Sequence, residues 1–451
     1  MNKIIITAPF GSTFKNLFLN VIFLELLLKK YNEIHIFTPI PLKDVKKIFN
    51  YEQYPSISLH FIPEKFKFFQ MVFSQATIIS FNKYINSSTF DVKTKDQSLI
   101  FSQRLILGLC LFLRFFLSWK KQYLFFDYFK FLFSKDEKTK LLISKIKPDV
   151  IFVTAPSFRF DFSVIKEALD RCIPIVGMVH SWDNLSSKGP ININFEKILI
   201  WNKFQEEEIL SFFSDYKGSV HKVGIPQLDF YLKNKNLLSK ENLCEYLGIT
   251  NDRKIITYTT GTHPMIPNEN IIIEKIIKEF EKSIVFKWFL LVRLHPRDDI
   301  KYYKNLKKYN NVKIETTNSK NIQLNDGMGF QMEDLVHYGN ILKNSDVILN
   351  VVSTVLLEAL VMRTPAIGIA FDEDKLDFYS SVKRFYKFNH AEYLLRRDGS
   401  HIAHSLSDLV KKINFCINHK YVKTDTAKEL AHSLRGNSGE KIANILCEYC
   451  K

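Results

Sequence analysis

Cysteine is scarce and scattered in this sequence. Its 451 residues include six cysteines, and only Cys447 and Cys450 lie close together. Neither a second pair nor a histidine cluster accompanies them, so the spacing predicts no zinc site and no disulfide framework. A reducing, cytosolic compartment fits this cysteine pattern best.

Long apolar runs are also missing. No segment reaches the roughly 18 uninterrupted apolar residues that a membrane-spanning helix needs. The nearest candidate, residues 105–119, is interrupted by Arg114. The opening segment, MNKIIITAPFGS, has one early lysine and a short apolar run before a turn. It therefore predicts a first β-strand rather than a secretory signal.

Several motifs of nucleotide and metal chemistry are absent. The sequence has no Walker motif, no GxGxxG after the first strand and no DxD triplet of the metal-using sugar transferases. We therefore expect no metal and no bound cofactor. Zinc-finger spacing, an RNP-like aromatic run and a helix-turn-helix pattern are missing as well, which argues against nucleic acid as a partner.

A positive charge surplus is present. There are 63 Lys and Arg against 47 Asp and Glu, a formal net charge of +16. This surplus predicts an anionic partner, either a phosphorylated substrate or an anionic membrane. Hydrophobic residues make up 46% of the chain, enough to build large cores.

Short apolar runs alternate with amphipathic stretches along most of the chain, which predicts an α/β protein with parallel sheets. The expected strands are 3–8, 33–38, 149–154, 174–179 and 197–201, then 254–260, 288–294, 312–315, 346–351 and 365–370. A polar, lysine-rich stretch separates the two series. We expect two Rossmann-like βα domains that face each other across a cleft, with ligands at the carboxyl ends of the strands.

The predicted domain bounds follow from this alternation. Residues 1–225 form an acceptor-side domain, and residues 226–400 form a nucleotide-binding domain. Residues 401–451 form helices that pack back on the domains. Within the first domain, residues 62–135 interleave aromatic and apolar side chains with Lys and Arg. Two interpretations of this insertion stay open: core helices with solvated lysines, or a surface that docks among lipid headgroups.

The clearest candidate binding site lies at two strand ends of the second domain. The strand 288–294 ends at Arg293 and His295, where Pro296 stops the ladder, and cationic side chains at this point suit phosphate. Ser353 and Thr354 follow another strand and open a helix, whose N-terminus favours anions. One turn further on, Glu358 is placed to accept ribose hydroxyls.

A third loop of the second domain follows the strand 254–260. Gly261 permits a close approach of the backbone, and the hydroxyl of Thr260 or Thr262 is suited to bind phosphate.

In the first domain a dense polar loop follows the strand 174–179. His180 and Asp183 are candidate general bases, because deprotonating an attacking hydroxyl needs a group within hydrogen-bond reach. The turn after the first strand is a further candidate. The acceptor-side candidates are Trp182, Asn184, Lys188, Gly11 and Ser12.

These motifs resemble a known group of enzymes. A strand ending in Arg-x-His-Pro, followed about sixty residues later by a Ser-Thr helix start with Glu one turn in, resembles GT-B-fold transferases. It is similar to bacterial sialyl- and Kdo-type transferases and to CDP-glycerol glycerophosphotransferases. The loop HSWDNLSSKG looks like that of surface-polysaccharide transferases of this group. The resemblance covers roughly residues 174–372.

The resemblance implies a metal-independent glycosyltransferase. It would move a sugar from a nucleotide-linked donor, CMP- or UDP-linked, to a glycan or lipid-linked acceptor during capsule or lipopolysaccharide synthesis. The expected location is the cytoplasm, peripheral on the inner face of the membrane. Three alternatives stay open: a CDP-glycerol-type glycerophosphotransferase, a nucleotide-sugar 2-epimerase of the same fold, and a non-catalytic glycan- or lipid-binding scaffold.

Overall fold

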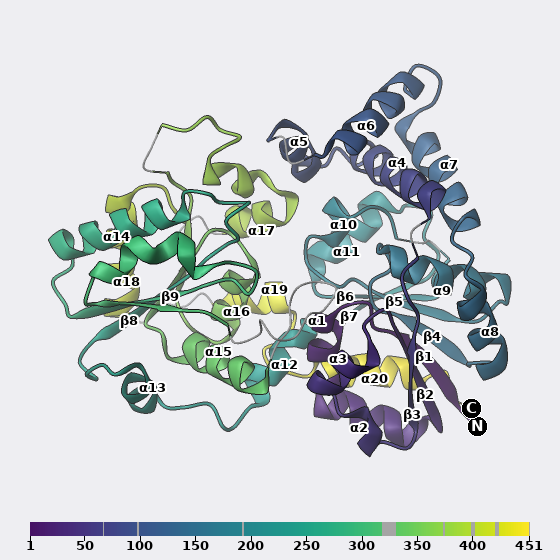
Figure 1. Ribbon diagram of the computed structural model, residues 1–451, viewed down its shortest axis with the longest axis horizontal. Coiled ribbons are helices and arrows are strands. Elements are labelled where there is room, and N and C mark those ends of the chain that lie inside the picture. Colours follow the sequence, from purple (N-terminus) through teal and green to yellow (C-terminus); the bar gives the residue numbers. More distant parts are fainter. Residues whose placement is uncertain are drawn as a thin grey trace. The chain divides into compact units, whose positions relative to one another are not determined.

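The computed structural model divides the chain into two compact units, shown in Figure 1. Unit 1 comprises residues 1–229 and 437–451, and unit 2 comprises residues 230–436. The structure describes residues 1–65, 67–96, 99–191, 194–317, 331–372, 375–397, 402–419 and 424–450.

Unit 1 is built around a seven-stranded parallel sheet with the order β3-β2-β1-β4-β5-β6-β7. Its strands are β1 (Lys3–Thr7), β2 (Glu33–Thr38), β3 (Ile57–Phe61), β4 (Val150–Val153), β5 (Ile175–Met178), β6 (Lys197–Ile200) and β7 (Ser219–Lys222). The strand order reverses direction between β1 and β4. In open parallel sheets, this is the point at which ligands bind.

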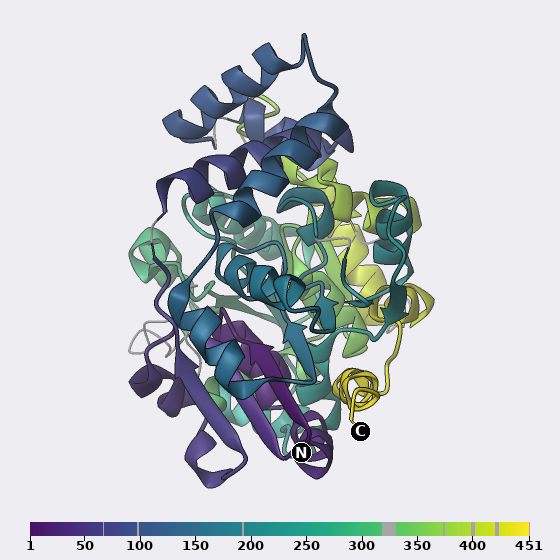
Figure 2. The ribbon, with the colours of Figure 1, turned by 90° about the vertical axis from the view of Figure 1, so that its right-hand side faces the viewer.

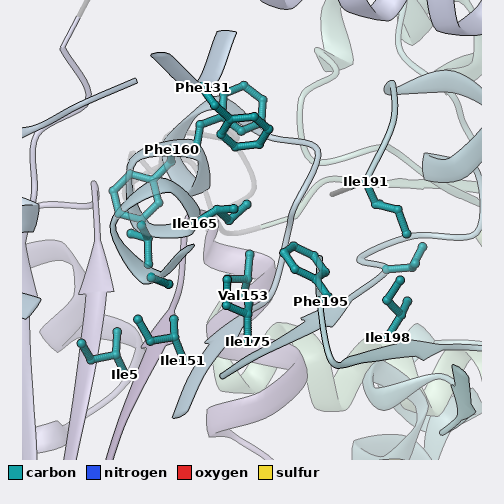
Figure 3. Packing of buried hydrophobic residues seen from close by; sticks show 14 of the residues in the cluster. Ile5, Phe131, Ile151, Val153, Phe160, Ile165, Ile175, Ile191, Phe195 and Ile198 are labelled. Atoms are coloured by element: carbon teal, nitrogen blue, oxygen red, sulfur yellow. The ribbon is translucent and has the colours of Figure 1, made fainter. Parts of the chain in front are cut away.

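Helices cover both faces of this sheet. Those of the sheet layers are α1 (Gly11–Thr13), the π-helix η1 (Phe14–Phe18), α2 (Val21–Lys30), α3 (Leu42–Ile48), α8 (Glu137–Ile146), α9 (Arg159–Asp170), α10 (Asn184–Ser187), α11 (Lys203–Phe212), α12 (Pro226–Lys233) and α20 (Ser438–Cys447). Apolar side chains from β1, β4, β5 and α9, including Ile5, Val153, Ile175 and Ile165, fill one buried layer of the core (Figure 3). Because the strands are covered on both faces, their sequences are nearly continuous apolar runs.

The described residues of the insertion at 62–135 form four helices. These are α4 (Phe68–Tyr84), α5 (Ser88–Lys95), α6 (Phe101–Leu113) and α7 (Trp119–Leu132). Helix α4 packs against both α6 and α7, and Ala76, Ile79, Cys110 and Phe126 share a small buried cluster. The insertion therefore has a core of its own, as the first of the two sequence interpretations predicts, but it also leaves large apolar side chains exposed.

Unit 2 contains a six-stranded parallel sheet with the order β10-β9-β8-β11-β12-β13. Its strands are β8 (Lys254–Thr259), β9 (Trp288–Arg293), β10 (Val312–Glu315), β11 (Val347–Asn350), β12 (Ala366–Ile369) and β13 (Ile402–Ala403). The strand order reverses between β8 and β11. All ten strands expected from the sequence are present, so the predicted α/β fold with parallel sheets is confirmed.

The helices of unit 2 follow its strands along the chain. They are α13 (Lys240–Leu247), α14 (Glu269–Ser283), the 3-10 helices η3 (Ile300–Lys308) and η5 (Val382–Lys387), α15 (Met332–Asn344), α16 (Thr354–Val361), α17 (Asn389–Arg397), α18 (Leu406–His419) and α19 (Thr424–Ala431).

The division of the chain differs from the predicted boundary at residue 400. Strand β13 pairs with β12, and α18 packs on β11, β12 and β13, so the chain stays in unit 2 as far as Gly436. Only the segment from Asn437 onward returns to unit 1, where α20 packs against α2.

Buried Asp229 lies where the chain leaves unit 1, and it binds the segment with which the chain returns to that unit. Its carboxylate accepts the backbone N–H groups of Ser438 at 3.1 Å and Gly439 at 2.7 Å, and the side-chain amide of Asn20 at 2.7 Å. These bonds hold the start of α20 against the segment where the chain leaves unit 1.

No single helix among the described residues is long and apolar enough to cross a bilayer. The bent pair 11–18 and 21–30 passes that test only when its two helices are taken together, and they meet at 76°. Several apolar side chains of this pair, including Phe14, Leu17 and Phe23, are buried in unit 1, whereas Val21 is exposed.

Candidate functional site

In unit 1, two predicted residues from distant loops lie in contact. Ser12 follows β1 and His180 follows β5, and the Ser12 hydroxyl lies 3.1 Å from His180 Nε2. The ring of Phe10 packs against the imidazole, with centroids 5.3 Å apart. The contact orients the imidazole at the carboxyl ends of the strands, as a general base requires.

The loop that follows His180 has two kinds of residue. Trp182 and Asn184 are buried, so they support the loop from within. Asp183 and Lys188 are partly exposed, and Asp183 Oδ2 accepts the Ser187 hydroxyl at 2.9 Å. Of the predicted polar residues in this loop, Asp183 and Lys188 therefore remain accessible to a ligand, as does His180.

The helical insertion adds a lysine to this loop. Burial and the positive charge of Lys188 lower the pKa of Lys93, while Asp183 counteracts this effect. Lys93 belongs to α5, which packs against α10. Sequence reasoning missed Lys93, because nothing in the local pattern of 88–95 indicates its neighbours.

The first turn of unit 1 lies deeper than its predicted acceptor role implies. Gly11 and Ser12 are both buried in α1. Behind them, the Thr154 backbone N–H donates to the Thr7 hydroxyl at 3.0 Å, which joins β1 to β4 at the reversal of strand order. Buried Asp161 accepts the Ala155 N–H at 3.0 Å, and burial raises the pKa of Asp161 to about 8.

In unit 2, the loops after β8 and β9 are joined by hydrogen bonds. The Thr260 hydroxyl accepts the backbone N–H of His295 at 3.0 Å. His295 Nδ1 accepts the N–H of Arg297 at 3.1 Å, which places the ring proton on Nε2. Burial, together with the charge of Arg297, lowers the pKa of His295 to about 4. His295 is therefore a neutral hydrogen-bond donor near pH 7.

Ser353 and Thr354 begin α16 as the sequence predicts. Ser353 is the N-cap, and its hydroxyl accepts the Val355 N–H at 3.1 Å and donates to Asn350 Oδ1 at 2.7 Å. Asn350 Nδ2 in turn donates to the carbonyl and the hydroxyl of Thr259, each at 2.8 Å. Buried Asn350 therefore fixes the end of β11 to the end of β8. It is a positioning residue that the sequence reasoning missed, although it lies only three residues before Ser353.

Gly261 contributes differently from its predicted role. Its N–H donates to the carboxylate of buried Glu269, at 2.9 Å to Oε2 and 3.1 Å to Oε1. A Cβ on Gly261 would lie 2.8 Å from Ile266 Cδ1, so a larger residue here would require the end of the Ile266 side chain to shift. Thr262, the third predicted residue of this loop, is partly exposed, and its carbonyl accepts the N–H groups of Met265 and Ile266.

Two buried carboxyl groups, those of Glu269 and Asp298, form hydrogen bonds around these loops. Tyr258 donates to Glu269 Oε1 at 3.1 Å, and Tyr303 donates to Asp298 Oδ2 at 2.7 Å. The N–H of His263 lies 3.4 Å from Asp298 Oδ1, and the His263 ring stacks on Tyr302. Burial raises the pKa of Glu269 to about 8, even though it accepts several hydrogen bonds.

Arg293 and Glu358, both predicted to contact the donor, lie in a buried charged cluster. The Arg293 guanidinium forms ion pairs with Asp334 and, at 3.6 Å, with Glu315. Glu358 accepts the Tyr338 hydroxyl at 2.6 Å, and burial followed by this charge raises the pKa of Tyr338. These charges stabilise the floor of the site, while Thr260, Thr262, His295, Ser353 and Thr354 lie at the strand ends.

A family comparison agrees with this arrangement. Residues 186–444 match the family model of CDP-Glycerol:Poly(glycerophosphate) glycerophosphotransferase. The chain belongs to this family. The matched segment contains all of unit 2 with its strand-end residues, and it begins within α10 of unit 1. The resemblance found in the sequence motifs is thereby confirmed, and the protein is a nucleotide-linked transferase of the GT-B fold.

The solved structures that resemble this chain support the fold. The S. aureus MnaA-UDP co-structure has a TM-score of 0.53 at 13% identity, over 100% of this chain and 97% of that one. UDP-GlcNAc 2-epimerase from Neisseria meningitidis, bound to UDP-GlcNAc, has a TM-score of 0.52 at 13% identity, with 99% and 100% covered. A glycosyltransferase from Rickettsia africae has a TM-score of 0.52 at 12% identity, with 100% and 99% covered. No curated protein matches the sequence significantly.

Proposed function

We propose that this protein transfers glycerol phosphate, or a closely related polyol phosphate, from a CDP-linked donor to a hydroxyl group of a surface-polymer acceptor. The observation that carries this proposal is the family match, which spans the whole of unit 2. The location of the neutral His295 at the end of β9, and of the α16 N-terminus after β11, is consistent with a diphosphate held by unit 2.

In this proposal unit 2 binds the donor. The Nε2–H of His295 and the hydroxyls of Thr260, Thr262 and Thr354 donate hydrogen bonds to phosphate oxygens. The positive end of the α16 dipole adds a favourable charge interaction. A neutral histidine can strengthen this interaction during the reaction, because negative charge that develops on the departing nucleotide raises the pKa of the imidazole.

Unit 1 binds the acceptor and supplies the base. His180 takes the proton of the acceptor's hydroxyl group while the oxygen of that hydroxyl forms a bond to the outer phosphorus of the donor. The bond from that phosphorus to the bridging oxygen breaks, and CMP leaves with the electron pair. Ser12 orients His180, and the positive charges of Lys188 and Lys93 suit a phosphorylated acceptor, although Asp183 offsets part of them.

Glycosyl transfer is the second candidate. The fold that this chain shares with the Rickettsia africae glycosyltransferase favours it. The same residues would then act while the acceptor oxygen attacks a sugar carbon, and the whole nucleotide phosphate would leave. In both cases we propose that catalysis needs no metal, and that the reaction occurs in the cytoplasm at the inner face of the membrane.

The test is a thermal-shift screen with CMP, CDP, CDP-glycerol, UDP, UDP-GlcNAc and GDP. A ligand that binds the folded protein raises its melting temperature by mass action. We expect cytidine nucleotides to stabilise the wild-type protein and the effect to be lost in His295→Ala. His419→Ala, which removes an exposed histidine of unit 2, is the matched control.

Product analysis then separates the candidates. Release of CMP from CDP-glycerol in the presence of a hydroxyl acceptor, unaffected by EDTA, would support the proposal. Conversion of soluble UDP-GlcNAc without an acceptor would contradict the proposal and indicate a nucleotide-sugar 2-epimerase instead. The absence of any nucleotide effect would favour a non-catalytic scaffold.

A further inference from the structure

From Leu105 to Leu113, helix α6 has no charged, amide or hydroxyl side chain, although much of it lies at the surface. One side of the helix is buried, where Cys110 packs with Ala76 and Ile79 of α4. The opposite side exposes 76% of Phe101, 60% of Leu105 and 59% of Phe112. These exposed positions, together with Leu109, recur at helical spacing and form one stripe. A helix of a soluble surface layer normally has polar side chains there, so this stripe needs a different explanation.

The turn that follows α6 extends the stripe. Phe115 is 84% exposed and Phe116 is 73% exposed, and the rings of Phe112 and Phe116 meet with centroids 5.7 Å apart. Since a phenylalanine presents roughly 150–250 Å², the four exposed rings leave on the order of 500 Å² of aromatic surface in solvent. The largest apolar patch of an ordinary monomer has about that size, and such a patch commonly marks an interaction site.

This apolar face lies at an extremity of unit 1. Figures 1 and 2 show α6 beyond α4, on the side of the insertion that points away from the seven-stranded sheet. Within unit 1, no other described element covers the exposed side of Phe115 or Phe116, as their exposed fractions show.

The charge around the face is positive. Between residues 99 and 135 the sequence has one acid, Asp127, which pairs with buried Lys130. The other basic residues of this segment are Arg104, Arg114, Lys120, Lys121 and Lys135. Arg114 and Lys121 are exposed, and among the described residues no ion pair engages them. A symmetric contact between two copies of this face would bring basic residues against basic residues, whereas anionic lipid complements them.

We infer that α6 and the turn at residues 114–117 form a membrane-docking face that lies in the headgroup region of an anionic bilayer. Phe101, Leu105 and Phe112 would lie along the acyl boundary, with Phe115 and Phe116 inserted at the end. Helix α6 has 13 residues, about 20 Å at 1.5 Å per residue, too short for a hydrocarbon core of about 30 Å. The helix therefore lies in the interface rather than spanning it. This inference goes beyond the proposed transfer reaction and does not depend on it.

The experiment is co-sedimentation of the full-length protein with vesicles of phosphatidylcholine alone and of phosphatidylcholine mixed with phosphatidylglycerol. We expect binding to the mixed vesicles that weakens as salt is raised. The double variant F115S/F116S should bind at least about tenfold more weakly, because it removes two aromatic side chains that would otherwise move from water into the bilayer. R114E/K121E should lose the preference for phosphatidylglycerol.

Two controls keep the test specific. The double variant L141S/L210S removes exposed leucines of α8 and α11 in the same unit and should bind vesicles like the wild-type protein. The nucleotide thermal shift should be unchanged in F115S/F116S, which shows that the variant is folded and that the two proposals fail separately.

Three results would overturn the inference. They are no binding to either vesicle, equal binding by F115S/F116S and the wild-type protein, and a dimer in light scattering that F115S/F116S converts to a monomer without any vesicle binding. The last result would assign the face to a second copy of the chain.

Discussion

The two sheets of this protein end in loops that hold their histidines in different ways. At the reversal of strand order in unit 2, the loops are fixed from below by buried groups: Asn350 joins β8 to β11, and Glu269 holds Gly261. In unit 1, buried Thr7 and Thr154 likewise join β1 to β4. The histidines differ, because the ring of His180 contacts the Ser12 hydroxyl of a neighbouring loop, whereas His295 of unit 2 is bound through its backbone N–H and Nδ1.

Under the proposed function, this difference corresponds to a division of roles, with the donor bound by unit 2 and the acceptor by unit 1. A nucleotide offers the same phosphates and ribose in every reaction, so a rigid, preorganised receptor binds it at low entropic cost. A polymer acceptor changes as it grows, and a general base must be free to take a proton from it. The buried hydrogen bonds of Asn350 and Glu269 suit the first requirement, and the partly exposed His180, Asp183 and Lys188 of unit 1 suit the second.

The largest effect is expected from His180→Ala, which tests the open loop. Loss of the base should lower the rate of transfer about 10²- to 10⁴-fold with little change in melting temperature. Ser12→Ala should have a smaller effect, because it removes only the contact that orients the ring. The measurement is the rate of CMP release, with His221→Ala in the same unit as the control. Full activity in His180→Ala would show that His180 is not the general base.

Arg293→Met tests whether the floor of unit 2 depends on its buried charges. It leaves the carboxylates of Asp334 and Glu315 without their cation, which should cost about 3–5 kcal/mol of stability. Arg297→Met, at an exposed position four residues along the same strand end, should change stability by less than about 0.5 kcal/mol. Thermal unfolding of both variants measures the difference. If Arg293→Met is as stable as Arg297→Met, the guanidinium is not needed for packing, and a direct role at the donor becomes the better reading.

Asn350→Ala tests the link between β8 and β11. It removes the hydrogen bonds to Thr259 and Ser353, and we expect a loss of about 1–3 kcal/mol together with weaker nucleotide binding. Asn344→Ala is the matched control, because Asn344 also donates two hydrogen bonds but at the far end of α15. Calorimetry with the stabilising nucleotide should show reduced affinity only for Asn350→Ala. Equal affinities in the two variants would show that the link does not shape the site.

A pH-dependent effect is expected from Glu269. Its pKa is raised from 4.5 to about 8, so the folded protein retains a proton that the unfolded chain releases between these values. The contribution of Glu269 to stability therefore falls as pH rises through this window. The side chain in Glu269→Gln stays neutral at every pH. The melting temperature of this variant, measured relative to that of the wild type, should therefore rise from pH 5 to pH 8. Glu274→Gln should show no such trend there, because the pKa of Glu274 is lowered to about 2. A constant difference between Glu269→Gln and the wild type would contradict the buried, protonated carboxyl.

The sequence predicted the strands that are buried on both faces and the edge strand β10, and it missed three other strands among the described residues, each at a sheet edge. Strands β3 and β7 lie at the edges of the first sheet with mostly partly exposed side chains, and β13 has two residues. An edge strand needs no continuous apolar run, so its pattern resembles that of a loop. The boundary at residue 400 was misplaced for the same reason, since β13 keeps the following helices in unit 2.

For the candidate site, the sequence by itself determined which loops carry polar residues. A buried parallel strand must end in a loop at the sheet edge, so the Arg-His-Pro and Ser-Thr motifs and the loop of His180 were visible as strand-end clusters. Sequence alone also determined the charge and the aromatic content of the insertion at 62–135.

Only the tertiary structure decided where each polar side chain lies. Arg293 and His295 are two residues apart on one strand, yet Arg293 is buried against Asp334 and Glu315, while the ring of His295 is partly exposed. Likewise, Lys93 lies beside Lys188 because two helices far apart in sequence pack together. A buried charge is stable only beside its partner, and partners that come from distant segments are set by packing rather than by local sequence.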